Sequence, residues 1–221
     1  MKTITIASCK GGSAKTTSVV TLAWRAAQDL GRVGMIDLNS SQGTLTQWWN
    51  ARGRTVNPYL MEGTDLEDDL RVLRETGFQL CLIDTPPANM DLIEVAVVLS
   101  DAVIIPVMCS YFDTSAVDAV VDMCRRRNKP YRFLLSAYDK REAFASVTTD
   151  TFAALMGRGE TFMSRLSYDA GYRIGQLDGK AGPEKSKKLK DEVDALWGEV
   201  CALVKIEVPP RLAVVKGGRR G

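Results

Sequence analysis

The stretch SCKGGSAKTT, residues 8–17, decides the fold class because it separates a short apolar run from a helix-like run. It is close to the phosphate-binding pattern G-x-x-x-x-G-K-[ST], in which glycines let backbone N–H groups surround a phosphate. Two residues depart from that pattern, since Cys9 stands at the first glycine and Ala14 at the glycine before the lysine. In their place the stretch holds a glycine pair, Gly11 and Gly12, and a second lysine.

The rest of the chain repeats this alternation of strand-like and helix-like segments. Apolar runs rich in β-branched residues are typical of strands covered on both faces, and the stretches between them are long enough for crossover helices. The predicted strands are 3–8, 33–37, 78–84, 102–108 and 131–136, and the predicted helices are 16–30, 65–75, 92–99, 113–126 and 184–205. The order predicts an α/β fold, a mostly parallel twisted sheet with helices on both faces.

Composition excludes several classes of protein. The 221 residues are 45% hydrophobic and contain no histidine, which removes Ser-His-Asp catalysis and most zinc enzymes. The five cysteines are widely spaced, as reduced thiols of a cytosolic protein are. No apolar run could span a membrane, and the start has no signal-peptide pattern, so we expect a cytoplasmic protein. We expect one domain over 1–208 and a basic, flexible tail over 209–221, since no repeat or linker divides the chain.

Each polar residue of the loop has a predicted role in holding a nucleotide. Lys15 fits the lysine that reaches the β and γ phosphates, and the hydroxyl of Thr16 fits a magnesium ligand. Asp37 and Asp84 end predicted strands at the same edge of the sheet, where both can reach the magnesium. Ala14 is acceptable only if its φ is negative, as at a helix start. The predicted nucleotide-binding residues are Lys10, Gly11, Gly12, Ser13, Ala14, Lys15, Thr16 and Thr17.

Three motifs together carry a family resemblance. The sequence K-G-G-x-x-K-T-T at 10–17, GMIDLNSSQG at 34–43 and LCLIDTPPA at 80–88 resemble the deviant Walker A class of P-loop ATPases, the ParA/MinD family. Residues 101–117 and 163–178 are similar to later segments of that family. The D-T-P-P and Q-G elements resemble the ParA branch, in its small form without an N-terminal helix-turn-helix domain.

The resemblance implies an ATP-dependent switch. Lys10 then corresponds to the signature lysine that reaches across a homodimer to the partner's ATP, with ATP and Mg²⁺ as cofactors. Such dimers bind double-stranded DNA without sequence preference, position a cargo and answer to a ParB-like or cargo-adaptor protein. The resemblance further implies a cytoplasmic, nucleoid-associated protein that does not use a membrane.

Two positions depart from the family pattern. Asn39 stands where the family has a second aspartate that orients the attacking water, and an asparagine can hold a water but cannot accept its proton. We therefore expect slow hydrolysis, and the alternative is an ATP-locked scaffold that hardly turns over. Ser136 stands near the position of an adenine-contacting asparagine. The predicted catalytic residues are Lys10, Lys15, Asp37, Asn39 and Asp84.

Clusters of basic residues are the candidates for contacts with DNA phosphates. They are Arg125, Arg126, Arg127, Lys129, Lys185, Lys187, Lys188, Lys190, Arg219 and Arg220. A dethiobiotin-synthetase-like ligase is the enzymatic rival, and Lys10 together with the basic C-terminal region argues against it. We expect Trp48 and Trp49 to pack a helix on the sheet, and the acidic stretch 62–69 to begin a helix.

Overall fold

The computed structural model describes residues 1–39, 42–62, 65–87, 89–109, 114–139, 141 and 145–208. Over these residues six strands form one sheet in the order β3-β2-β4-β1-β5-β6, and each neighbouring pair is parallel. The strands are β1 (Lys2–Ile6), β2 (Val33–Asp37), β3 (Tyr59–Met61), β4 (Leu80–Asp84), β5 (Ala102–Met108) and β6 (Tyr131–Ser136). The sheet confirms the predicted α/β class.

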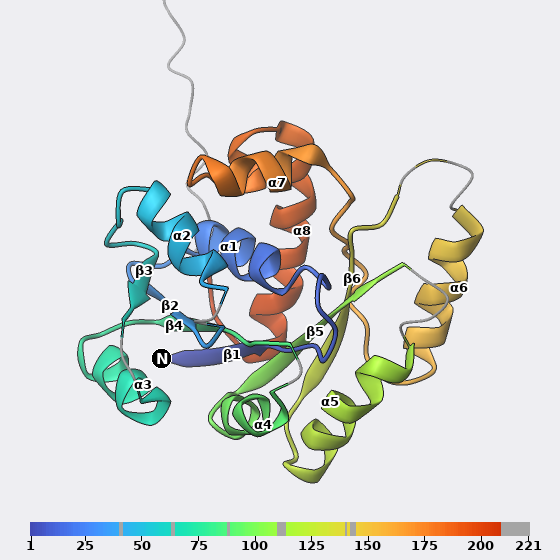
Figure 1. Cartoon of the computed structure of the whole chain (residues 1–221), viewed down its shortest axis with the longest axis horizontal. Coiled ribbons are helices and arrows are strands. Elements are labelled where there is room, and N and C mark those ends of the chain that lie inside the picture. The colour runs from blue at the N-terminus through green and yellow to red at the C-terminus, as the bar shows by residue number, and fades with distance from the viewer. Residues whose placement is uncertain are drawn as a thin grey trace, which may run out of the picture.

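Helices cover both faces of the sheet (Figure 1). The helices are α1 (Lys15–Ala26), α2 (Thr44–Ala51), α3 (Leu66–Glu75), α4 (Met90–Val98), α5 (Thr114–Arg126), α6 (Ala145–Met156), α7 (Ala170–Leu177) and α8 (Lys187–Val204). A short 3-10 turn, Gly182–Glu184, precedes α8. In Figure 1, α1, α2, α7 and α8 lie on one side of the sheet and α3, α4 and α5 on the other. No helix of the described residues is long and apolar enough to cross a membrane.

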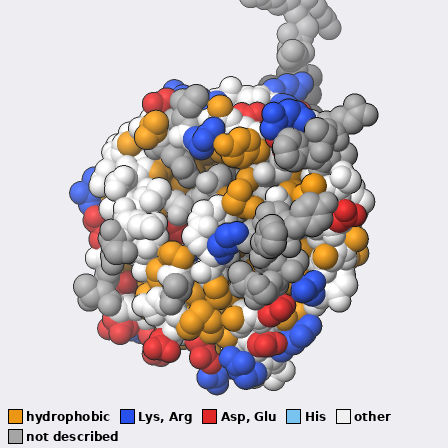
Figure 2. Space-filling view, turned by 45° about the vertical axis from the view of Figure 1, so that its right-hand side comes forward, with side chains coloured by type: hydrophobic (Ala, Val, Ile, Leu, Met, Phe, Trp, Pro, Cys, Tyr) orange, Lys and Arg blue, Asp and Glu red, His pale blue; other side chains and the backbone are white. Residues whose placement is uncertain are grey.

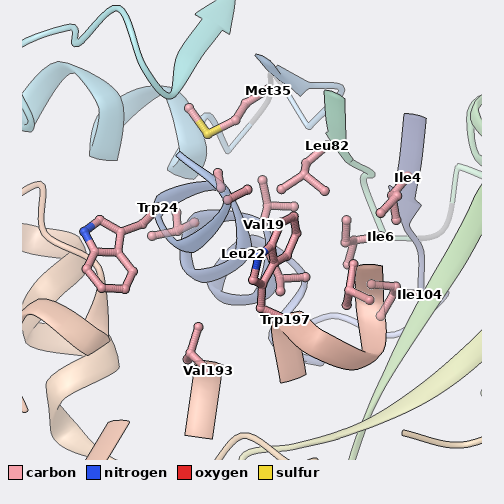
Figure 3. Packing of buried hydrophobic residues seen from close by; sticks show 14 of the residues in the cluster. Ile4, Ile6, Val19, Leu22, Trp24, Met35, Leu82, Ile104, Val193 and Trp197 are labelled. Carbon is pink, nitrogen blue, oxygen red and sulfur yellow. The ribbon is translucent and has the colours of Figure 1, made fainter. Parts of the chain in front are cut away.

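The largest apolar cluster lies between the sheet and the layer formed by α1 and α8. Figure 3 shows Trp197 of α8 close to Leu22 and Val19 of α1, on the side facing Ile6 and Ile104 of the sheet. The indole of Trp197 is 2% exposed, so it fills the space between two helices and the sheet. Burial of so much apolar surface fixes α1 against the strands, and α1 begins within the 8–17 stretch, at Lys15.

The sequence located most of the elements and missed three of them. All five predicted strands are present, but β3 was not predicted because three residues carry too little periodicity. Helices α6 and α7 were also missed, and α2 was anticipated only through the helix expected at Trp48 and Trp49. The helix predicted from residue 184 begins at Lys187, after the 3-10 turn.

Two smaller predictions are confirmed. Trp48 and Trp49 are 0% and 3% exposed and pack α2 into the main core. Asp65 begins α3 by accepting a hydrogen bond from the backbone N–H of Asp68, as the acidic stretch suggested. The boundary predicted at residue 208 stays a prediction, since 209–221 lie outside the described residues.

Candidate nucleotide-binding site

Neighbouring strands bring the predicted loop and both aspartates to one edge of the sheet. Asp37 at the end of β2 is in register with Asp84 at the end of β4, and Asp84 is in register with Ile6 at the end of β1. The 8–17 loop leaves β1 at this edge and leads into α1. Parallel strands place their carboxyl ends together, which is where ligands bind in open α/β sheets.

The ammonium group of Lys15 lies inside the loop. Its side chain is buried, and Nζ donates hydrogen bonds to the backbone oxygens of Ser8 at 3.1 Å and Lys10 at 3.0 Å. Burial lowers the pKa of Lys15, and the nearby carboxylate of Asp84 opposes that shift. The cation is therefore held at the point where the loop's backbone N–H groups would surround a phosphate.

Thr16 and Asp84 form the second feature of the loop. The Thr16 hydroxyl donates a hydrogen bond of 2.6 Å to Asp84 Oδ2, and Asp84 is 1% exposed. Burial raises the pKa of Asp84 to about 7, and the charge of Asp37 adds to the rise, while Thr16 and Lys15 oppose it. The other carboxylate oxygen, Oδ1, is buried with no hydrogen-bond partner in the described part of the chain.

These oxygens fit a magnesium ion that is bound together with a nucleotide. Magnesium prefers hard oxygen ligands and keeps several waters, so one hydroxyl and one carboxylate suffice when phosphate oxygens supply the rest. The described residues contain no group of three His, Cys, Asp or Glu side chains that could hold a metal alone. The orphaned oxygen of Asp84 is the group that a magnesium-bound water would satisfy.

Asp37 organises the loop after β2. Its carboxylate accepts hydrogen bonds from the N–H of Asn39 at 3.0 Å and from the N–H and hydroxyl of Thr46 at 3.2 and 3.1 Å. These contacts join the end of β2 to the first turn of α2. The predicted magnesium contact of Asp37 stays a prediction, because its described partners all come from this loop and from α2.

Asn39 lies beside the phosphate loop. It is 6% exposed, and its Nδ2 donates a hydrogen bond of 3.1 Å to Oε1 of Gln42. Both residues line the same cavity as the loop. The structure therefore brings Asn39 to the site where the sequence placed it, as a neutral group.

The prediction for the backbone of Ala14 is wrong. Ala14 has φ 70° and ψ 29°, in the left-handed region, although it directly precedes α1. The chain turns sharply from the loop into the helix at this point, so the backbone needs a conformation that glycine adopts without cost. A Cβ there costs about 1–2 kcal/mol. The N–H and hydroxyl of Ser18 both donate to the backbone oxygen of Ala14, at 2.9 and 2.8 Å, which helps to hold the turn.

Ser136, which the sequence places near an adenine-contacting position of the family, lies beneath the phosphate loop. Ser136 is fully buried, and its hydroxyl donates a hydrogen bond of 3.0 Å to the backbone oxygen of Ser13. Side chains alternate along a strand, and the one at 136 points under the phosphate loop. Ser136 therefore supports the loop, while Ala137, the next residue, lines the cavity.

A cavity of about 320 Å³ joins these groups to a wall that the sequence did not assign. The phosphate loop, Asn39 and Gln42 line one part of it. Its lining also includes Leu166, Ser167, Tyr168, Asp169, Tyr172 and Arg173. The resemblance of 163–178 to a late family segment pointed to this stretch but not to individual residues. Figure 2 shows apolar side chains near the centre of the face turned toward the viewer.

The two basic clusters do not form one surface. Arg125 and Arg126 end α5 and Arg127 follows it, at the bottom of Figure 1, whereas the lysines 185–190 precede and begin α8 near α7 at its top. Acidic and basic side chains lie together along the lower edge of the molecule in Figure 2. Consistent with this, Arg127 pairs with Glu94 at 2.8 Å.

Two lysines of the second cluster, residues 185–190, are engaged in ion pairs. Lys185 lies 2.5 Å from Asp178, and Lys190 lies 2.5 Å from Asp194. Lys187 and Lys188 are exposed in the first turn of α8. Of the remaining predicted contacts, Lys129 donates a hydrogen bond of 2.8 Å from Nζ to the backbone oxygen of Ser100, while Arg219 and Arg220 lie outside the described residues.

Comparison with known proteins agrees with this geometry. The family described as VirC1 protein matches residues 1–125, more than half of the chain and all three motifs. The chain belongs to the VirC1 protein family. The chromosome-partitioning ATPase Soj of Thermus thermophilus is 27% identical to this VirC1-family chain over 147 residues, covering 53% of the chain and 59% of Soj. The chain therefore spans well under two thirds of Soj.

Solved structures show the same fold. McdA of Cyanothece superposes on the VirC1-family chain with a TM-score of 0.77 at 17% identity, covering 90% of the chain and 99% of McdA. MinD of Aquifex aeolicus gives a TM-score of 0.72 at 16% identity, covering 95% of the chain and 99% of MinD. These likenesses confirm the predicted P-loop NTPase fold, and with the sequence matches they confirm the predicted ParA-type family.

Proposed function

We propose that the protein is an ATP-dependent dimerising switch that positions DNA or another cargo. The observation that carries the proposal is the geometry of the 8–17 loop: Lys15 is buried inside it, and the hydroxyl of Thr16 donates a hydrogen bond of 2.6 Å to Asp84. Its relative Soj is named a chromosome-partitioning ATPase, and McdA has been solved as an ATP complex. ATP binding and hydrolysis are therefore the activities that we assign to the cavity.

The chain's own groups support a phosphoryl transfer to water. Lys15 is placed to neutralise charge on the β and γ phosphates, and the N–H groups of Gly11 and Gly12 are placed to donate to them. Thr16 and Asp84 would hold magnesium, directly or through water, and the ion would offset charge that develops on the phosphate oxygens. Such positioning supplies most of the catalysis in this class of reaction, which needs little help from a base.

Asn39 determines the rate of ATP hydrolysis that we expect. Its amide can orient a water at the mouth of the loop, but it cannot take up the proton that the water loses. With Nδ2 already donating to Gln42, the side chain is held in one orientation. We propose slow hydrolysis that a ParB-like or cargo-adaptor protein stimulates.

Lys10 is the proposed sensor of the dimer. It is exposed at the loop, while its backbone oxygen accepts the hydrogen bond from Lys15. An exposed cation beside the phosphates can stabilise the ATP of a second subunit, as an arginine finger does in other ATPases. Homodimerisation would then depend on the γ-phosphate.

Nonspecific double-stranded DNA is the proposed surface on which the switch acts. Lys187 and Lys188 are the exposed lysines of the first turn of α8 and suit phosphate contacts, which need charge but no base readout. The corresponding location is the cytoplasm, at the nucleoid. Arg125 and Arg126 at the end of α5, with Arg127 after it, would form a separate contact, because this end of α5 lies on another side of the molecule (Figure 1).

The test is molecular mass by light scattering, with ADP or with ATP and magnesium, and DNA retention measured in parallel. Wild type should become a DNA-bound dimer only with ATP. Lys10→Ala should still bind ATP but remain monomeric and release DNA. Lys15→Ala should lose ATP binding itself, which separates the sensor from the phosphate anchor.

A wild type that ignores both nucleotide and DNA would contradict the proposal. The loop would then serve other phosphate chemistry, and a dethiobiotin-synthetase-like ligase would become the better interpretation. The second candidate within the switch class is an ATP-locked scaffold, which the neutral Asn39 favours. Stable ATP dimers that show no turnover when DNA and a partner are present would support the scaffold.

A further inference from the structure

We propose that Glu192 of α8 is a positioning residue for the nucleoside end of the cavity. The inference rests on the proposed function, since it concerns how the same site holds ATP. The phosphate loop and residues 166–173 line the same cavity, so the nucleoside of an ATP bound at the loop can contact the wall made by residues 166–173. What fixes this wall therefore decides how well the nucleoside is held.

The first part of the wall, residues 166–168, pairs through its backbone with the end of β6 and the residues that follow it. Backbone hydrogen bonds join Leu166 N to Leu135 O at 3.0 Å, Tyr138 N to Leu166 O at 3.2 Å and Tyr168 N to Tyr138 O at 2.7 Å. The chain after β6 and the segment 166–168 thus run side by side. This pairing sets the backbone, but the hydroxyl of Ser167 and the ring of Tyr172 need a contact from elsewhere.

A single carboxylate oxygen supplies that contact. Oε2 of Glu192 accepts hydrogen bonds from the N–H of Ser167 at 3.2 Å and from its hydroxyl at 3.0 Å, and it lies 3.5 Å from the hydroxyl of Tyr172. Ser167 and Tyr172 are both buried residues of the cavity wall. Burial raises the pKa of Tyr172, and Glu192 raises it further, so the tyrosine stays protonated and can donate.

The same helix provides a matched control. Glu199 lies about two helical turns further along α8 and also accepts from backbone N–H groups, those of Met163 at 2.9 Å and Ser164 at 2.8 Å. Met163 and Ser164 do not line the nucleotide cavity. The two glutamates therefore tie the same segment to α8 with similar bonds, and only Glu192 acts at the cavity wall.

Removing the Glu192 carboxylate should weaken binding of the nucleoside and leave binding of the phosphates unchanged. In Glu192→Ala, the buried N–H and hydroxyl of Ser167 lose a charged acceptor, so the wall can rotate away from the nucleoside. The phosphate loop is held by β1, α1 and Ser136 instead, and none of these contacts involves Glu192. We expect ATP affinity to fall about tenfold, the size of effect that one lost charged hydrogen bond produces.

The experiment compares ATP with inorganic tripolyphosphate, which carries the phosphates without a nucleoside. Displacement of a fluorescent ATP analogue by each competitor, with magnesium present, is measured for wild type, Glu192→Ala, Glu192→Gln and Glu199→Ala. Glu192→Ala should bind ATP about tenfold more weakly and tripolyphosphate as wild type does. Glu192→Gln keeps an acceptor oxygen and should recover most of the loss, while Glu199→Ala should bind both competitors as wild type does.

Each other outcome overturns a defined part of the reasoning. Equal losses for ATP and tripolyphosphate in Glu192→Ala would mean a general structural role, as would equal ATP losses in Glu192→Ala and Glu199→Ala. Unchanged ATP affinity in Glu192→Ala, with wild type binding ATP well, would overturn the inference alone. If wild type bound no nucleotide, the proposed function would fail and this inference with it.

Discussion

Arg25 offers a test of how α1 is held to α8 behind the phosphate loop. Its guanidinium lies 2.8 Å from Asp29 in an ion pair and donates a hydrogen bond of 2.5 Å from Nε to Asp194 of α8. The Arg25 and Asp29 side chains are 7% and 3% exposed, whereas Asp194 is 30% exposed. Asp29 also accepts a hydrogen bond of 2.9 Å from the indole of Trp197. The pair is therefore shielded from water on the side of Asp29.

Arg25→Met should cost stability mainly through Asp29. The substitution removes the cation that faces the buried carboxylate of Asp29, which also accepts a hydrogen bond from the Trp197 indole, and breaking a buried pair in this way costs about 3–5 kcal/mol. The more exposed Asp194 adds little, because water and Lys190 can compensate it. We expect a loss near the lower limit, about 3 kcal/mol in the free energy of unfolding.

The assay is urea unfolding followed by tryptophan fluorescence. The double variant Arg25→Met with Asp29→Asn should recover most of the loss, because it removes the buried charge that has lost its cation and keeps an acceptor for Trp197. Arg71→Met is the matched control, since Arg71 pairs with Asp68 and Glu75 at an exposed position and should leave the midpoint unchanged.

Two results would refute the reasoning. A loss below about 1 kcal/mol in Arg25→Met would mean that the buried pair contributes no more than a surface pair does. A double variant as unstable as the single one would mean that lost packing of the arginine stem, and not the buried charge of Asp29, causes the loss.

Three further predictions concern the site and its surface. Ala14→Gly should raise the unfolding free energy by up to about 1 kcal/mol, because the left-handed backbone there strains a Cβ, and a lower thermal midpoint would contradict this. Thr16→Ala should remove most of the magnesium dependence of ATP affinity in titrations with and without the ion, since it deletes the hydroxyl bound to Asp84; a magnesium effect as large as in wild type would exclude Thr16 as a ligand. Lys187→Glu with Lys188→Glu should weaken retention on DNA and make the negative slope of log affinity against log salt shallower by about 2. An unchanged slope would place the DNA contact elsewhere.

The sequence by itself determined the class of fold and the phosphate end of the site. Five apolar runs specify buried parallel strands, because hydrophobicity and β-branching act locally along the chain. The motif at 8–17 likewise holds its pattern in consecutive residues, so roles for Lys15 and Thr16 could be predicted before the structure, and the strand-end positions of Asp37 and Asp84 predicted that they lie at the same edge of the sheet. Short elements such as β3 could not, since three residues hold no readable period.

The tertiary structure decided everything that depends on contacts between distant residues. The left-handed backbone of Ala14 follows from how the loop must enter α1, and the direction of Ser136 follows from its position beneath Ser13. The cavity wall at 166–173 is assembled from the pairing of 166–168 with the chain after β6 and from a glutamate on α8. None of these contacts leaves a pattern in neighbouring residues, because packing between elements, and not local propensity, selects them.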